Sequence, residues 1–436
     1  MQHWHLYKPD SSQPWNLARV VHLHRRIAFG ATIAEQQRDL AEGPQTAVTR
    51  LLERTARQDT PTAFDELANV IGNAAADSPN PDRLKAWWLY RCLFTPDPLQ
   101  ERLTLMWHNH FATSNLKVGN LYQMKQQNET LRKHARAKFG DMLHAMLRDP
   151  ALLVWLDAPS NRKGHPNENL ARELMELFTL GVGNYTETDV KEVARSLTGW
   201  TVRKGRFENR TDQHDDGEKT ILGQTSSFNT KHIVDLLLKQ SAVSKRLAWR
   251  LTSEFFGEGV VCDEAEAELA ALLRDNALNI GETVETMLRS RLFFSDANIN
   301  SRICDPVSFL IGPLRTLGIT SPPPSTLLLA DWLRRMGQDL FYPPNVGGWN
   351  GGRSWLSTRT VIARTNYAAA LVKGQLRSPS QAPQLTDLCA AKADRLTTAE
   401  FLATSLGIRS DDFTPTNDSP EDIVVSLMTR PEAHLH

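Results

Sequence analysis

The chain has 436 residues, enough to bury a large hydrophobic core, and one big domain or two of ordinary size are both possible. Its 50 basic and 50 acidic side chains cancel, which excludes an overall field that would attract nucleic acid or an anionic membrane. No stretch approaches the roughly 20 uninterrupted apolar residues of a transmembrane helix. We therefore expect a soluble protein with no nucleic-acid partner and no transmembrane segment.

The start of the chain and its cysteines bear on where the protein works. The opening residues contain no apolar run of signal-peptide length. This predicts a cytoplasmic protein, or a periplasmic or extracellular one if a leader has been removed. The cysteines lie far apart without C-x-x-C spacing, which favours reduced thiols over a zinc knuckle or a disulfide framework.

Apolar residues recur at helical spacing through the N-terminal part of the chain. Asp97 and Pro98 mark the start of one helix, because aspartate caps a helix N-terminus and proline there lacks only an N–H that would have no partner. The predicted helices occupy residues 18–28, 46–57, 82–94, 98–115, 119–138, 141–148 and 150–156.

Residues 166–200 are predicted to form two helices joined by a glycine turn. One face of the first helix is apolar, and the other carries an arginine among carboxylates. Gly181 and Gly183 end this helix, because glycine adopts the left-handed conformation without strain. Thr186 followed by Asp189 matches a capping box at the start of the second helix.

The pattern changes after residue 200. Residues 201–207 and 219–222 flank a turn-rich segment at 212–217, which predicts a hairpin or an irregular excursion. Four glycines and two prolines at 341–355 predict a loop. Further helices are predicted at residues 231–240, 242–256, 264–275, 282–293, 306–317, 325–336, 356–373, 398–405 and 420–428.

These elements predict a mainly α fold: a single large multi-helix domain with a small β-hairpin-like excursion near residues 201–223. The segment 374–382 is rich in Ser, Pro and Gln and is the best linker candidate. We therefore divide the chain into a helical core domain at residues 1–375 and a C-terminal helical extension at 376–436 packed on that core.

The segment around His108 and His110 is the most metal-like part of the sequence. Histidines two positions apart lie about 200° apart on a helix, so one of them should face inward, and His110 continues the side of Leu103 and Met106. A metal could take one histidine, or both if the helix ends at Trp107. The alternative is a buried histidine hydrogen-bonded within the core.

Acidic residues of the central motif form a second candidate group. Glu173 and Glu176 can act as metal ligands or acid/base groups, because side chains at i and i+3 converge on a helix. Glu168 and Glu176 each lie one turn from Arg172 and can pair with it. The alternative is a solvent-exposed face whose ion pair contributes about 0.3–0.5 kcal/mol.

Two further pairs can bind or react. Asp215 can orient His214 as a base, or both can bind a divalent cation, whereas a solvated turn explains the same residues. Trp349 and Trp355 suit stacking against a sugar ring or a peptide, and the alternative is a loop that packs its tryptophans over the helices. The phosphate-loop, dinucleotide-loop, G-x-S-x-G and H-E-x-x-H motifs do not occur.

Five segments, in this order along the chain, resemble the bacterial family called domain of unknown function 1800. They are HLHRRIAFGAT at 22–32, WHNHFATSNLKV at 107–118, the whole of 166–200, HDDGEKTILG at 214–223 and LFYPPNVGGWNGG at 340–352. The resemblance covers about residues 20–375 and implies no settled activity. It does imply a partner from a second family, domain of unknown function 1501, which has a phosphatase or sulfatase look, and with it an envelope or extracellular role.

Two functions are therefore expected, and whether the protein is an enzyme stays open. The first is a metal-dependent hydrolase or transferase acting on a carbohydrate or phosphate-like substrate. Its metal ligands would be His108, His110 and Glu176; its catalytic residues His214, Asp215, Glu173 and Arg172; and its substrate-binding residues Asn169, Trp349 and Trp355. The alternative is a non-catalytic binding or scaffold protein that works with a partner such as a domain of unknown function 1501 protein. Convergence of the metal ligands with His214 around one cavity would favour the enzyme.

Overall fold

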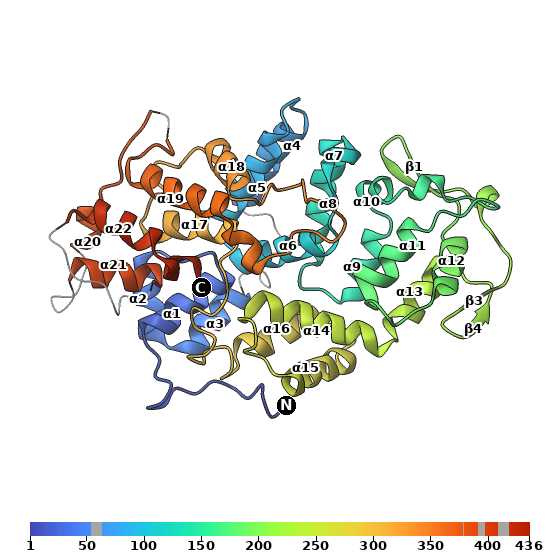
Figure 1. The fold of residues 1–436 in the computed structure, drawn as a ribbon, viewed down its shortest axis with the longest axis horizontal. Helices are drawn as coiled ribbons and strands as arrows, with labels where there is room; N and C mark the ends of the chain where they lie inside the picture. The colour runs from blue at the N-terminus through green and yellow to red at the C-terminus, as the bar shows by residue number, and fades with distance from the viewer. Residues whose placement is uncertain (54–62, 378, 391–396, 409–417) are drawn as a thin grey trace.

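The computed structural model describes residues 1–53, 63–377, 379–390, 397–408 and 418–436, and these are mainly α-helical (Figure 1). Within these ranges, strands occur only as two small antiparallel sheets of two strands each. The mainly α fold expected from the sequence is therefore confirmed. None of the helices in these ranges combines the length and the apolar character that crossing a bilayer requires.

Helices of the N-terminal part follow the predicted pattern closely, with three additions. They are α1 (Leu17–Ile27), α2 (Ile33–Glu42), α3 (Pro44–Glu53), α4 (Ala63–Ala76), α5 (Asp82–Phe94), α6 (Pro98–His110), α7 (Asn115–Val118), α8 (Leu121–His134), α9 (Phe139–Met146) and α10 (Pro150–Trp155). The last four residues of the helix predicted at 46–57 lie outside the described ranges. The sequence analysis missed α2, α4 and the short α7, and the helix predicted at 98–115 ends at His110. Helix α2 begins with a capping box in which Thr32 and Glu35 exchange hydrogen bonds.

Helix α6 lies between two hydrophobic clusters and is buried on all sides. Leu103 and Met106 pack in the first cluster, which contains α9, α12, α14 and α16, whereas Leu105 packs in the second, which contains α5, α17, α19 and α22. A helix that is apolar or buried all round is a core helix. Side chains of α6 are therefore shielded from solvent whichever way they point.

A buried carboxylate joins α6 to α5 and α8. Glu101 accepts hydrogen bonds from Arg91 Nε at 2.8 Å, from Arg132 Nε at 2.6 Å and from Trp88 Nε1 at 3.1 Å. Burial opposes ionisation, but the two guanidinium groups outweigh it and lower the pKa of Glu101 to about 2. The network fixes three helices around one charge.

The central motif forms an α-helix, a π-helical turn and a second α-helix. These are α11 (Asn169–Glu173), η2 (Leu174–Thr179) and α12 (Glu187–Ser196), preceded by the 3-10 turn η1 (Ala158–Ser160). The π turn is marked by the bond from Leu180 N to Met175 O at 2.7 Å. Such turns change the phase of a helix and are often found at functional sites.

The excursion near residues 201–223 consists of two hairpins. Strand β1 (Trp200–Arg203) pairs with β2 (Arg206–Asn209), and β3 (Lys219–Ile221) pairs with β4 (Gln224–Ser226); the 3-10 turn η3 (Thr211–Gln213) separates them. Each hairpin closes on a dipeptide ending in glycine, Lys204-Gly205 or Leu222-Gly223, with positive φ at both residues. Two-residue hairpin turns require that backbone, so each strand pairs with its neighbour rather than across segment 212–217.

The C-terminal part is again helical and packs on the N-terminus. Its elements are α13 (Thr230–Leu238), α14 (Ser241–Phe255), α15 (Asp263–Asp275), α16 (Ile280–Leu288), α17 (Pro306–Thr316), α18 (Thr326–Arg335), η4 (Gly352–Leu356), α19 (Thr358–Val372), α20 (Leu385–Cys389), α21 (Thr398–Leu406), α22 (Pro420–Thr429) and η5 (Pro431–His434). Helices α20 to α22 lie at one end of the molecule, and the two hairpins lie at the other (Figure 1). Residues on both sides of position 375 contribute to the second hydrophobic cluster. One residue of the expected linker, at position 378, lies outside the described ranges.

Candidate functional site

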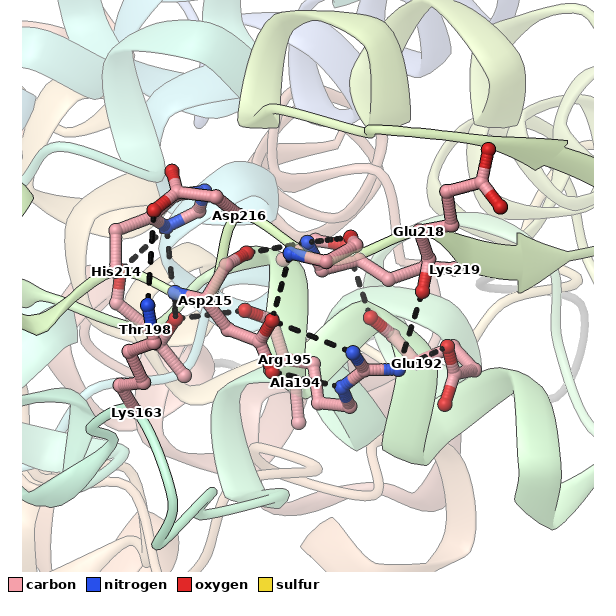
Figure 2. A network of polar contacts seen from close by, with 12 residues as sticks. Lys163, Glu192, Ala194, Arg195, Thr198, His214, Asp215, Asp216, Glu218 and Lys219 are labelled. Carbon is pink, nitrogen blue, oxygen red and sulfur yellow. Dashed lines mark hydrogen bonds and ion pairs between the residues drawn. The ribbon is translucent and has the colours of Figure 1, made fainter.

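The ring of His214 is held by backbone rather than by a carboxylate (Figure 2). Its Nδ1 lies 3.0 Å from the carbonyl oxygen of Thr198. Because a carbonyl can only accept, Nδ1 carries a proton in this contact. The hydroxyl of Thr198 also accepts from the backbone N–H of Asp215 at 2.8 Å, so the loop carrying His214 is fixed to the end of α12.

Asp215 points to an arginine of α12. Its carboxylate accepts from Arg195 Nε at 2.8 Å and from Arg195 Nη2 at 3.3 Å, and from the backbone N–H of Gly217 at 2.9 Å. The bond from Arg195 is the main reason why the pKa of Asp215 is lowered to about 2. Arg195 also donates to Glu192 at 2.8 Å. The side chains of Asp215 and His214 thus bind different groups, and Asp215 does not orient the His214 ring.

Arg172 lies in an exposed ion-pair group at the other end of α12. Its guanidinium binds Glu187 through both Nη atoms, at 2.7 and 2.8 Å, and contacts Glu168 at 3.3 Å. The pairing with Glu168 was anticipated from the helical spacing, whereas Glu187 comes from the next helix. Glu187 and Arg195 are eight residues apart on α12, or about 12 Å along its axis. The structure therefore separates Arg172 from His214 and Asp215.

Glu173 and Glu176 lie beside each other at the π turn. Glu176 accepts a hydrogen bond from the hydroxyl of Tyr185 at 2.7 Å, instead of pairing with Arg172. Burial raises the pKa of Glu173, and the neighbouring Glu176 raises it further. Asn169, one turn earlier, donates to Asp157 at 3.0 Å.

Both candidate histidines of α6 are buried, on opposite sides. His108 is 1% exposed and lies edge-on to Trp88 and Phe341, and burial lowers its pKa to about 3. His110 is 6% exposed, packs against Phe178, and its ring lies 3.2 Å from the Phe178 carbonyl oxygen. The sequence predicted one inward histidine, but both are inside because α6 runs between two clusters.

The two tryptophans of the loop at 341–355 are buried as well. The backbone N–H and carbonyl of Trp349 bind the side chain of Asn109 on α6, and its ring lies 5.7 Å from His108. Trp355 packs close to Gly337 at the end of α18. This arrangement agrees with the alternative in which the loop packs its tryptophans over the helices.

The predicted metal ligands do not form a recognisable centre. Across residues 1–53, 63–377, 379–390, 397–408 and 418–436, no three His, Cys, Asp or Glu side chains are grouped so that they could hold a metal ion. The candidate histidines and acids fall into three groups: His108 and His110 in the core, Glu173 and Glu176 at the π turn, and His214 with Asp215 beyond the end of α12.

A surface hollow next to the central motif was missed by the sequence analysis. It has an empty volume of about 510 Å³, opens to solvent, and lies between residues 180–185 and the start of α14. Trp249 lines it and is 47% exposed, and the Arg246 guanidinium lies 5.8 Å from the centre of its indole ring. Asn184 and Lys245 also line the hollow.

The signal for this hollow was present in the helix predicted at 242–256. Lys245, Arg246 and Trp249 recur at i, i+1 and i+4, so they share one face of the helix. That face combines an aromatic ring with two cations. The sequence does not show that this face of the helix stays open to solvent. In the structure, α14 packs against the π turn, where Arg246 Nε donates to the Leu177 carbonyl oxygen at 2.8 Å, and this face lines the hollow.

Comparison with protein families identifies this mainly α chain as a family member. The chain belongs to the family described as protein of unknown function (DUF1800), whose model matches residues 22–435. The match extends well past residue 375, where the resemblance of the motifs was expected to end, and includes the C-terminal helices. A search of curated proteins finds no match, and a search of solved structures finds none either.

Proposed function

We propose that the protein binds an acidic carbohydrate in the hollow between residues 180–185 and α14. The observation that carries the proposal is Trp249, a large indole left 47% exposed in an open hollow beside two cationic side chains. An indole face suits the apolar face of a sugar ring. The cations Lys245 and Arg246 suit a carboxylate or sulfate on the same sugar.

The remaining groups of the hollow fit hydroxyl recognition. Ser241 offers a hydroxyl and Asn184 an amide, which together can donate to and accept from sugar hydroxyls. Arg246 is anchored by its bond to the Leu177 carbonyl, so its guanidinium is oriented before a ligand arrives. Pre-oriented groups lose less conformational freedom on binding.

Binding can be tested by calorimetry with defined glycans. Polygalacturonate supplies carboxylates, chondroitin sulfate supplies sulfates, and maltohexaose is the neutral comparison. We expect an acidic glycan to bind and Trp249→Ala to weaken its affinity at least tenfold, about 1.4 kcal/mol. Leu116→Ala, which removes another exposed apolar side chain, should leave the affinity unchanged.

Two results would refute the proposal. The first is that neither acidic glycan binds better than maltohexaose. The second is that Trp249→Ala and Leu116→Ala bind an acidic glycan equally well while circular dichroism shows both variants folded.

A second candidate is hydrolysis or transfer on the same ligand, favoured by the raised pKa of Glu173. Because its pKa is raised, Glu173 keeps its proton to a higher pH than an ordinary glutamate and can act as a general acid, with Glu176 beside it as its partner. Glu173→Gln should then abolish product formation from a bound acidic glycan without changing its affinity. Full activity of Glu173→Gln would exclude this role.

The partner implied by the family resemblance is also a proposal. A domain of unknown function 1501 protein co-expressed with this chain should co-purify with it through size-exclusion chromatography. Separate elution of the two proteins at micromolar concentration would argue against a stable complex.

A further inference from the structure

The end of the chain lies beside α1 (Figure 1). Five arginines from distant parts of the chain gather there. They are Arg25 and Arg26 at the end of α1, Arg102 on α6, Arg302 between α16 and α17, and Arg364 on α19. Electrostatic coupling links Arg26 to Arg25, Arg102 and Arg302. The backbone of the last residues completes the group, since Arg25 Nη2 donates to the Leu435 carbonyl at 2.7 Å.

Within the described part of the chain, two side-chain carboxylates, those of Asp305 and Glu254, form ion pairs with this arginine cluster. Asp305 lies 2.9 Å from Arg102 and 3.7 Å from Arg302, and Glu254 lies 3.6 Å from Arg102 and 3.4 Å from Arg302. Among the described residues, none forms an ion pair with Arg25, Arg26 or Arg364. Counting described side chains alone, the cluster has five guanidinium groups and two carboxylates.

Several guanidinium nitrogens of the cluster also lack acceptors. Arg26 is 1% exposed and donates through Nη2 to the Asn298 carbonyl at 2.8 Å and to Ser301 at 3.0 Å. Its Nε and Nη1, and the same two atoms of Arg364, are buried without a hydrogen-bond partner among the described residues. Buried cations without partners are strongly destabilising. Such donors call for an acceptor that the protein itself does not supply.

The histidines beside the cluster do not add to its charge. His22 and His436 are buried, and burial followed by the nearby arginines holds the pKa of each well below its ordinary value. Both rings are therefore neutral near pH 7. His436 Nε2 lies 3.0 Å from Arg302 Nη1 and accepts from it. The local field is positive because of the guanidinium groups alone.

A path from solvent reaches the edge of this cluster. Arg25 lines a surface groove together with Arg19, His22 and Asn300, and it also lines a more enclosed cavity together with Ser308 and His436. The same side chain therefore stands between the groove and the cavity. Arg19 is already paired with Asp296, which also lines the groove, so a small anion entering the groove would meet Arg25 as the cation that has no ion pair with any described residue.

We propose that the arginine cluster binds a small, multiply charged oxyanion: phosphate or sulfate, free or as the phosphoryl or sulfuryl group of a small metabolite. Guanidinium groups present their N–H donors in a fork that matches two oxygens of such an anion. The excess of guanidinium groups over side-chain carboxylates, and the unused donors of Arg26 and Arg364, suit the charge and the acceptor oxygens of such an anion. The groove and the cavity beside the cluster share no lining residue with the hollow at Trp249, and the proposal does not depend on the proposed glycan.

The test uses the purified full chain in a chloride buffer. Thermal denaturation is followed while sodium phosphate or sodium sulfate replaces sodium chloride at constant ionic strength. We expect a saturable rise of several degrees in Tm with at least one of the two anions. Ion chromatography after denaturation detects phosphate or sulfate that co-purified, and mass spectrometry of the released material detects a phosphorylated or sulfated metabolite.

Substitutions locate the effect. Arg26→Met should remove the anion-dependent rise in Tm, whereas Arg172→Met, in an exposed ion pair, should keep it. If Arg26→Met does not fold, Arg364→Met replaces it, and the wild-type protein still decides the matter. The proposal is overturned if the wild-type protein shows no saturable rise and releases no such anion. It is also overturned if a folded Arg26→Met responds like the wild-type protein.

Discussion

Replacing Glu101 with glutamine tests the buried network that joins α5, α6 and α8. The pKa of this carboxyl is lowered from 4.5 to about 2, chiefly by Arg132 and Arg91 acting against burial. One unit of pKa corresponds to about 1.4 kcal/mol, so the charged form contributes about 3 kcal/mol to stability. The variant also leaves the buried guanidinium of Arg132 without a counter-ion, whereas Arg91 keeps its ion pair with Asp65 at 3.5 Å. We expect Glu101→Gln to lower the free energy of unfolding at pH 7 by about 3–5 kcal/mol.

The direction of the pKa shift determines how the stability difference between Glu101→Gln and the wild-type protein depends on pH. Because the folded-state pKa of Glu101 lies below the unfolded value, the stabilisation is complete above about pH 4.5 and is lost as the pH falls towards 2. Urea unfolding at pH 7, 4 and 3 should therefore show the variant approaching the wild-type protein in acid. Glu285→Gln, which breaks an exposed pair with Arg289, is the control and should lose less than about 1 kcal/mol. A loss below about 1 kcal/mol for Glu101→Gln at pH 7, or a difference from wild type that does not shrink in acid, refutes the reasoning.

Three further predictions concern the candidate site. Gly199→Ala should lower the free energy of unfolding by at least about 1 kcal/mol more than Gly223→Ala. Both positions have positive φ, but only at Gly199 would an added methyl group meet the Arg210 carbonyl. Comparable losses for the two variants in chemical denaturation would contradict this. Arg172→Gln should cost less than about 1 kcal/mol in urea unfolding because its ion pairs are largely exposed, and a larger loss would show a role beyond those pairs. If Glu176 contributes to a divalent-metal site, a chelator should lower the Tm of the wild-type protein and leave the Tm of Glu176→Gln unchanged. An unchanged wild-type Tm, together with no metal in elemental analysis, would exclude a bound metal.

The sequence predicted most helices because their signals are local. Asp97 and Pro98 start α6 as expected, and Thr186 with Asp189 forms the capping box of α12. The hairpins were harder, since a periodicity of two does not say which strands pair. The deciding information was in the glycine dipeptides at residues 204–205 and 222–223, whose backbone forces each strand to turn back at once.

The site could be predicted only in part, because burial depends on the whole fold. Nothing near His108 in the sequence indicates that Trp88 and Phe341 will enclose it. Likewise, helical spacing predicted that Glu176 could pair with Arg172, but the π turn brings it to Tyr185 instead. Trp249 stays exposed because of how α14 packs, which no single stretch of sequence records.

The position of α6 also bears on how this chain can change over evolutionary time. Helix α6 has to fit two sets of neighbours, because Leu103 packs in the first cluster and Leu105 in the second. A replacement that shifts α6 to suit one cluster therefore disturbs its contacts with the other, and a compensating change in one cluster cannot relieve both. Variation should therefore accumulate on the outer helices and remain rare along residues 98–110.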